Sequence, residues 1–422
     1  APLRSQGIGT VLLQAAEDWQ GLDAGWSRQV GRLESRPGTE AARCALLHEL
    51  GENARLRLED VARAAEYHAR ALELDPDHQA RRELLAGLYA QIPGRWKEAV
   101  REHQRLLGSD PKRIDSYHRM RGILRDAGRA DETWCVCAAL AHLGRADPTE
   151  VQFYEQYRPR VALGTPAGLS EEAWVEDLVH PRQDRDLSRL LDALGGALAR
   201  GWAQTAKDVG LRKQDLQDAK ASPLALAKAL RQASGALEVP VPELYVVPHQ
   251  QGGLILAMTE PRASVAGQDF LAGLSPAELR FVAGHHIAAY RHDHYAVYLV
   301  ALAATKMRRS RADVLAAYVQ AAIAIGCPDA PVENTELVSQ VKGQLRADLT
   351  ASDIDRLREP AEALASKPGP DTTAWVRRAD LTADRAGALL CGDLPVAEQM
   401  LSRVPPLSSG LQSSTGAPLC SV

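Results

Sequence analysis

The chain has 422 residues, of which 45% are hydrophobic and 25% are charged. This length predicts roughly two to four domains, and the ordinary apolar fraction excludes wholesale disorder. Lys and Arg number 50 against 54 Asp and Glu, which gives a net charge of −4. A dedicated polyanion binder needs a basic excess, so we expect no nucleic-acid partner. Aromatic residues make up only 5%, while Ala and Leu are abundant, and this composition favours a mainly α fold.

Membrane insertion and a disulfide framework are also disfavoured. The longest apolar run, residues 295–305, is shorter than the roughly 18 residues that span a bilayer, so we expect no membrane span. The six cysteines are scattered, and six are too few for a disulfide scaffold in a chain of this length. This pattern favours a reducing, cytoplasmic compartment.

Asp-Pro recurs three times in the first half of the chain, at residues 75–76, 110–111 and 147–148. The copies lie 35 and 37 residues apart, and each follows an Ala- and Leu-rich stretch that predicts a helix. Before each of these helices lie a short turn and another predicted helix, for example at 114–126. Because proline cannot continue a helix, each Asp-Pro is expected to end one helical hairpin.

This pattern resembles the tetratricopeptide repeat, which has a period of about 34 residues. The resemblance covers residues 41–157. Residues 1–40 are interpreted as an N-terminal helical cap, with a further helix predicted over 10–35. Small residues are expected where paired helices approach closely, and the candidates are Ala64, Gly87, Ala99 and Gly122.

Such an array implies a protein partner that binds along the first helices of the hairpins. The residues expected to be exposed there and to contact the partner are Tyr89, His118, Arg119 and Arg121. Arg and Tyr are enriched at binding hot spots. Because the predicted helix at 114–126 is locally basic, we expect an acidic segment as the ligand. A basic face that is merely solvated is the alternative.

The second half of the chain changes character. Residues 158–227 are interpreted as a helical connector that begins with helix-breaking Pro and Gly. Short strands are then predicted over 243–248, 253–259 and 262–266. Ser275 caps the next predicted helix, with proline at its first position, and we expect that helix to run through His285 and beyond.

The predicted architecture is therefore a helical-hairpin repeat array joined to an α+β domain with a small β-sheet. This second domain is expected to span residues 228–404. A Ser- and Gly-rich flexible tail is expected over 405–422.

Histidines cluster after the predicted strands, at residues 285, 286, 292 and 294. A small sheet followed by a His-bearing helix is the layout of zinc peptidases, whose His-Glu-x-x-His motif aims two imidazoles at one metal. The domain resembles the gluzincin-type metallopeptidases of the HtpX and CAAX-prenyl-protease class. The matching blocks are Val-Pro-Val-Pro-Glu-Leu-Tyr-Val at 239–246, Leu-Ser-Pro-Ala-Glu-Leu at 274–279, Gly-His at 284–285 and Asp-Leu-Thr-Ala-Asp-Arg-Ala-Gly at 380–387.

The resemblance implies that the catalytic positions are vestigial. His285 keeps the first ligand position, whereas His286 replaces the general-base Glu and Ala289 replaces the second ligand His. Asp380 shortens the third ligand, and Asp384 keeps the position that orients the first His, so a His285–Asp384 hydrogen bond is expected. A methyl group cannot bind zinc, so at most two of three protein ligands remain. We therefore expect no catalytic residue, no metal and no cofactor.

The favoured function is a non-catalytic scaffold or adaptor with a pseudo-peptidase domain. One rival is a zinc metallopeptidase with a non-standard site built from the clustered histidines. On a continuous helix, however, only His285 and His292 would share a face, about 10 Å apart. A second rival is a structural subunit of a larger assembly, which has the same sequence signals as a scaffold.

Overall fold

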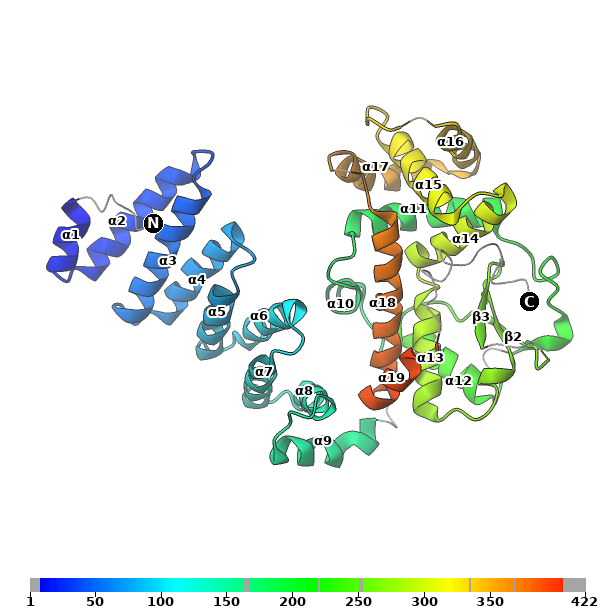
Figure 1. Cartoon of the computed structure of the whole chain (residues 1–422), viewed down its shortest axis with the longest axis horizontal. Helices are drawn as coiled ribbons and strands as arrows, with labels where there is room; N and C mark the ends of the chain where they lie inside the picture. The colour runs from blue at the N-terminus through cyan, green and yellow to red at the C-terminus, as the bar shows by residue number, and fades with distance from the viewer. Residues whose placement is uncertain are drawn as a thin grey trace. The chain divides into compact units, whose positions relative to one another are not determined.

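The computed structural model of the chain describes residues 8–161, 167–218, 221–249, 253–333, 335–367 and 369–404. The chain forms two compact units, Ala1–Tyr157 and Arg158–Val422 (Figure 1). The fold is mainly α, with one small mixed sheet in the second unit. Within the described residues, no helix is both long and apolar enough to cross a lipid bilayer. The tail expected at 405–422 lies outside them.

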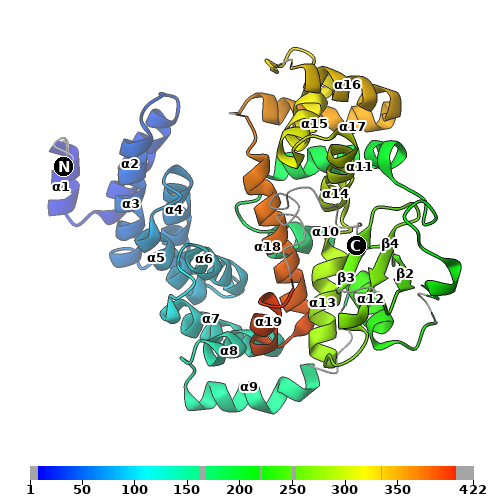
Figure 2. The same ribbon diagram turned by 45° about the vertical axis from the view of Figure 1, so that its right-hand side comes forward.

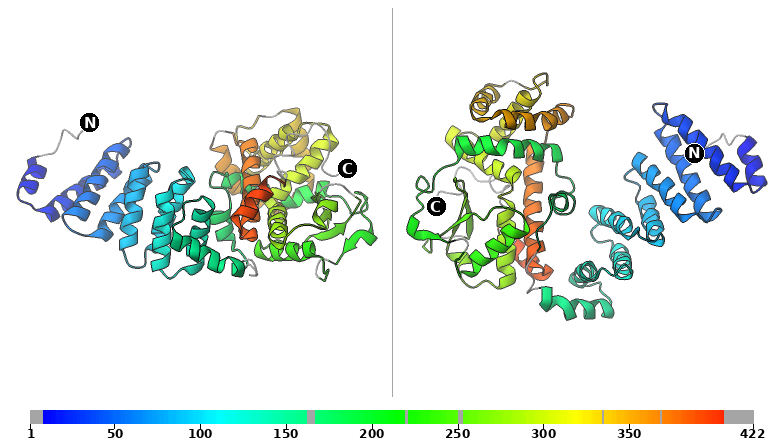
Figure 3. Two further views of the ribbon diagram at one scale, coloured as in Figure 1. Left: turned by 60° about the horizontal axis from the view of Figure 1, so that its bottom comes forward. Right: turned by 180° about the vertical axis from the view of Figure 1, so that it is seen from behind.

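The first unit is an array of helical hairpins, which Figure 3 shows side by side. Helices that are adjacent in the chain pack against each other, so each hairpin stacks on the next. Its helices are α1 (Ile8–Ala15), α2 (Trp19–Glu34), α3 (Glu40–Leu56), α4 (Val61–Leu74), α5 (Gln79–Gln91), α6 (Trp96–Ser109), α7 (Ile114–Asp126), α8 (Ala130–His142) and α9 (Pro148–Val161). The observed α7 coincides with the predicted helix at 114–126.

The Asp-Pro pairs do separate the hairpins. Asp75 and Asp110 follow the last residues of α4 and α6 and have φ values of −141° and −139°. A residue before proline is driven toward extended backbone, which stops the helix there. The third pair is placed differently, because Pro148 is the first residue of α9 and Asp147 accepts hydrogen bonds from the amides of Thr149 and Glu150.

The small residues of the array are only partly where we expected them. Ala64 and Ala99 are fully buried at helix contacts. Gly87 and Gly122 are not at such contacts, because a Cβ added to either would meet no atom within 4 Å. Ala86 is fully buried instead. Neighbouring helix positions differ by about 100° around the axis, so a shift of one residue moves a side chain from the contact to the surface.

The N-terminal cap contains two helices rather than the single helix predicted over 10–35. The chain reverses at Glu17, which has a φ of 54°, and Asp18 accepts a hydrogen bond of 2.8 Å from the Gly21 amide to begin α2. Trp26 on α2 is 8% exposed and belongs to an apolar cluster with residues of α3.

The second unit combines a four-stranded sheet with packed helices (Figures 1 and 2). The strands are β1 (Leu216–Gln217), β2 (Glu243–Val246), β3 (Leu254–Ala257) and β4 (Ala263–Ala266), in the order β1-β2-β4-β3. β2 and β4 are parallel, and the other neighbours are antiparallel. The sequence predicts β2, β3 and β4, but β1 has only two residues and no pattern to detect.

The larger helices of this unit pack against one another, and α13 also packs against the sheet. They are α11 (Arg185–Trp202), α12 (Ala225–Ala236), α13 (Pro276–Ala288), α14 (His292–Met307), α15 (Arg311–Gly326), α16 (Glu336–Asp348), α17 (Ala351–Ala365), α18 (Thr372–Cys391) and α19 (Leu394–Leu401). A short segment before α11 forms α10 (Glu171–Ala173) and η1 (Trp174–Leu178). η1 is a single turn of π-helix, whereas η2 (Lys213–Asp215) and η3 (Gln268–Phe270) are turns of 3-10 helix.

The segment interpreted as a connector, 158–227, contributes directly to the core of the second unit. Leu187, Leu190 and Leu194 on α11 are buried in the largest apolar cluster. They recur at helical spacing and place α11 against α14 and α17. α11 is therefore an integral part of the second unit.

The His-bearing helix runs through His285, as expected, but it ends before His292. α13 ends at Ala288, and α14 begins at His292 after Arg291, which has a ψ of 143°. Tertiary contacts fix this break: the Tyr290 hydroxyl donates to the Ala263 carbonyl at 2.6 Å, and the Tyr290 carbonyl accepts from Arg262 at 2.6 Å. No proline or glycine marks the break in the sequence.

Candidate functional site

The helix that carries His285 and His286 begins with a capping box. The Ser275 hydroxyl accepts from the Glu278 amide at 3.3 Å, and the Glu278 carboxylate accepts from the Ser275 amide at 2.7 Å. From this start, α13 runs into the interior, where both histidines are 2% exposed. Buried imidazoles need partners or must remain neutral, so their surroundings decide what they can do.

His285 lies opposite α18. Its Nε2 is 3.4 Å from Oδ1 of Asp384, so the two side chains that were expected to hydrogen-bond lie within ion-pair distance. The Phe281 ring stacks on the imidazole with ring centroids 6.1 Å apart. This arrangement holds His285 between an aromatic ring and a carboxylate.

Close approach of two backbones brings α13 and α18 together, as Figures 1 and 2 show. A Cβ added at Gly284 would lie 2.7 Å from the Ala386 carbonyl oxygen, and one added at Gly387 would lie 3.0 Å from the Phe281 carbonyl oxygen. Each helix therefore has glycine where the other presents its backbone. This contact sets the separation across which His285 reaches Asp384.

His286 faces the sheet. Its Nε2 is 2.9 Å from the Ser264 hydroxyl, which in turn is 2.8 Å from the Tyr290 hydroxyl. Burial, with a smaller contribution from neighbouring His285, lowers the pKa of His286 to about 3. The imidazole is therefore neutral near pH 7 and joins α13 to β4 through a hydrogen-bonded chain.

The other positions named from the resemblance, Ala289 and Asp380, offer little to a metal. Ala289 is 1% exposed and presents only a methyl group, and Asp380 is buried on α18 one turn before Asp384. Among the residues that the structure describes, no group of three or more His, Cys, Asp or Glu side chains could hold a metal ion. A catalytic zinc takes three protein ligands and a water, and the residues here do not fit that requirement.

The other two histidines of the cluster lie elsewhere. His292 is exposed at the start of α14, with its Nδ1 3.3 Å from Asp192 on α11. His294 is buried between Trp174 and Trp375, with ring centroids 6.2 Å and 5.6 Å away. The structure therefore does not bring together the four histidines that are close in sequence.

The partner-binding residues expected in the array also differ in exposure. Tyr89 is 9% exposed and belongs to the core of the α5/α6 hairpin, with the Arg95 guanidinium 4.8 Å from its ring centre. The expectation that Tyr89 is exposed was therefore wrong. It lies on the buried side of α5 because the apolar face of this helix includes positions 85, 88 and 89.

The basic residues of α7 have an unexpected acidic neighbour. Glu150, on α9, is 1% exposed, and its Oε1 lies 3.0 Å from His118 Nδ1 and 3.8 Å from Arg121 Nε. Arg121 also donates to the Thr149 hydroxyl at 3.2 Å. Arg119 is exposed and forms no ion pair among the described residues. Glu150 was not predicted as a functional residue. Its position three residues after Asp147 is the spacing of a capping residue, and the Glu150 carboxylate accepts a hydrogen bond from the Asp147 amide at 2.8 Å.

Part of the array matches a known family. Residues 55–124 match the tetratricopeptide repeat family. This stretch runs from the end of α3 to α7 and includes the complete α5/α6 hairpin. The array contains tetratricopeptide repeats. No curated protein sequence matches the chain.

Proposed function

We propose that this protein is a non-catalytic scaffold or adaptor that binds a protein partner through its tetratricopeptide array. The observation that carries the proposal is the repeat match at residues 55–124 within a stack of well-formed hairpins. Stacked repeats of this kind expose an extended surface suited to peptides and helices, and tetratricopeptide repeats generally mediate protein–protein interaction. The reducing compartment expected from the scattered cysteines remains part of this proposal.

The docking surface in this proposal is the exposed side of α7 around Arg119. The neighbouring basic residues already have carboxylate partners. Arg82 pairs with Glu102, Arg113 pairs with Glu83, and both His118 and Arg121 lie beside Glu150. Those pairs reduce the basic character that the sequence suggested. Arg119 retains an available guanidinium, which favours an acidic segment of the partner at this point.

Charge reversal at one position tests this surface. We expect Arg119→Glu in the full-length chain to reduce recovery of the partner from native-host extract, and the loss to be largest at low salt, where screening is weakest. The matched control is Arg101→Glu, which makes the same charge change at an exposed position on α6, the second helix of its hairpin. Equal recovery with both variants would remove α7 as the docking surface.

We further propose that the second unit is a metallopeptidase-like domain that has lost its catalytic set. Three observations support this proposal. The sequence blocks occur in the family's order, the helices that carry the first and third ligand positions pack together, and the His285–Asp384 pairing is kept. Buried Ala289 stands at the second ligand position and His286 at the general-base position, so zinc-dependent hydrolysis has no ligand set here.

The rival functions make different measurable predictions. A non-standard zinc peptidase requires about one bound zinc per chain. A structural subunit requires a stable assembly of fixed stoichiometry, and the mass of the native complex in host extract measures it. The scaffold proposal predicts that the partner dissociates as the salt concentration is raised and that the chain binds no zinc.

A further inference from the structure

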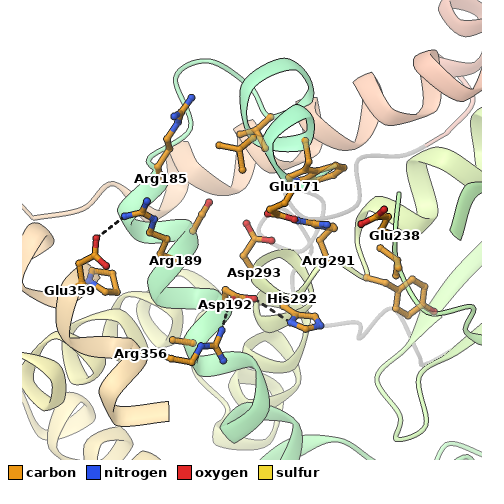
Figure 4. A pocket seen from close by; sticks show the side chains of 18 of the residues that line it. Glu171, Arg185, Arg189, Asp192, Glu238, Arg291, His292, Asp293, Arg356 and Glu359 are labelled. Carbon is orange, nitrogen blue, oxygen red and sulfur yellow. Dashed lines mark hydrogen bonds and ion pairs between the residues drawn. The ribbon is translucent and has the colours of Figure 1, made fainter. Parts of the chain in front are cut away.

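A cavity of about 730 Å³ lies in the second unit, away from His285 and Asp384. α11, η1, α17, residues 238–240 and the turn between α13 and α14 form its walls, as Figure 4 shows in close-up. Its volume is within the range of small-ligand sites. Of the residues singled out in the sequence, His292 lines it, whereas His285, His286 and Asp384 do not.

The arginines around the cavity are all neutralised. Arg291 is 2.5 Å from Glu171, Arg189 is 3.1 Å from Glu359, and Arg356 pairs with Asp192. Arg185 lies 3.6 Å from Glu176. Because every lining arginine already has a carboxylate partner, the cavity has no free guanidinium to attract an anion.

Two carboxylates that line the cavity have no arginine or lysine partner among the described residues. Asp293 and Glu238 form no ion pair with any lysine or arginine that the structure describes, and both line the cavity. Figure 4 shows Asp293 between Arg189 and Arg291. The Asp293 side chain is only 14% exposed; its Oδ1 accepts from the His294 amide at 3.0 Å, and the Oδ2 approaches no cation closer than His294 Nε2 at 4.0 Å.

One part of the wall is apolar. Trp174, Val175, Val179, Val239 and Pro240 line it, and the Arg291 guanidinium covers the Trp174 ring at 4.5 Å. An apolar wall beside two uncompensated carboxylates suits a ligand with a hydrocarbon stem and a cationic end. A hydrated metal ion makes no use of such a wall.

We propose that this cavity binds an organic cation, with Asp293 and Glu238 as its charge partners. The chemistry recognised is a primary ammonium or guanidinium group on an aliphatic chain. Either a free polyamine or a Lys or Arg side chain of a bound peptide supplies it. This site is independent of the docking surface on α7.

Calorimetric titration of the full-length chain tests the proposal. The probes are spermidine, a lysine-containing tetrapeptide with blocked ends, and inorganic phosphate. We expect at least one of the two cationic probes to bind and Asp293→Asn to weaken that binding by about tenfold, as for loss of a partly desolvated charge contact. Glu238→Gln is expected to weaken it by about threefold, because this carboxylate is exposed. Asn keeps the oxygen that accepts from the His294 amide.

The control is Glu359→Gln, which neutralises a lining carboxylate that is 83% exposed and already paired with Arg189. It is expected to change cation binding by less than about twofold. Preference for spermidine or for the peptide identifies the source of the cation. Failure of both cationic probes to bind, tighter binding of phosphate, or equal effects of all three variants would overturn the proposal. Glu238 is exposed, so Glu238→Gln decides the matter even if Asp293→Asn fails to fold.

Discussion

At the residue scale, a substitution at Gly284 tests the close contact between α13 and α18 that places His285 opposite Asp384. A methyl group there would lie 2.7 Å from the Ala386 carbonyl oxygen, and a helix backbone cannot move aside as a flexible side chain can. We expect Gly284→Ala to lower the free energy of unfolding of the second unit by about 1–3 kcal/mol, as other overpacked sites do. Urea denaturation followed by circular dichroism measures the change.

Gly343 provides the control within the same unit. It lies inside α16, is exposed, and would meet no atom within 4 Å if it carried a Cβ. Gly343→Ala is expected to raise stability by up to about 1 kcal/mol, because Ala is the better helix former. If both alanine variants are equally stable, α13 and α18 do not approach as closely as described.

His286 makes the stability of the second unit depend on pH. Its pKa is about 3 in the folded chain because burial penalises the charged imidazole, against about 6.5 for an unfolded histidine. Between these values the unfolded state binds more protons, so stability falls as pH falls through this window, by up to about 1.4 kcal/mol per pH unit.

The variant His286→Gln removes this titration and keeps an amide near the Ser264 hydroxyl. We expect its unfolding free energy, measured by urea denaturation from pH 7 to pH 4, to fall less steeply than that of the unmodified chain. Parallel curves would show that His286 is not neutral and buried.

Individual residues were only partly predictable from the sequence. The pairing of His285 with Asp384 follows from family positions 99 residues apart in the chain, and the structure contains it. The hydrogen bond between His286 and Ser264 has no local signal in the sequence, because it depends on how β4 is placed against α13. Tyr89 was wrongly predicted to be exposed, because a tyrosine on a helix suits a surface and a core equally well.

At the element scale, the register of the α5/α6 hairpin is open to test. Ala99 is fully buried where α6 meets its neighbours, so Ala99→Trp is expected to destabilise the array by about 1–3 kcal/mol or more. Gly87→Ala is the control on the partner helix, where a Cβ meets open space, and is expected to be neutral or stabilising. Thermal unfolding of the two variants measures the difference, and an unchanged midpoint for Ala99→Trp would contradict this register.

Elements with strong periodic patterns were predictable, and those fixed by distant contacts were not. The Asp-Pro breaks and the apolar periodicity locate α7 at 114–126, where the structure has it. The break between α13 and α14 depends on the contacts of Tyr290 with Ala263, which begins β4, and with Arg262 just before it, and both residues precede α13 in the chain. β1 exists only because β2 offers it an edge.

At the scale of the whole molecule, composition and repeats predict a mainly α chain with a repeat array followed by a unit containing a small sheet. The structure and the family match bear out the array and the fold class. The peptidase-like origin of the second unit stays a proposal, which predicts that the chain binds no zinc.

The central claim is that this chain acts by binding and not by zinc-dependent catalysis, and metal content tests it most directly. Elemental analysis of the purified full-length chain after dialysis, with a peptidase assay on the same sample, is the measurement. We expect far less than one zinc per chain and no cleavage, because Ala289 removes an essential ligand. The account would be contradicted if the chain held about one zinc and cleaved the substrate, and if His285→Ala lost both the zinc and the cleavage.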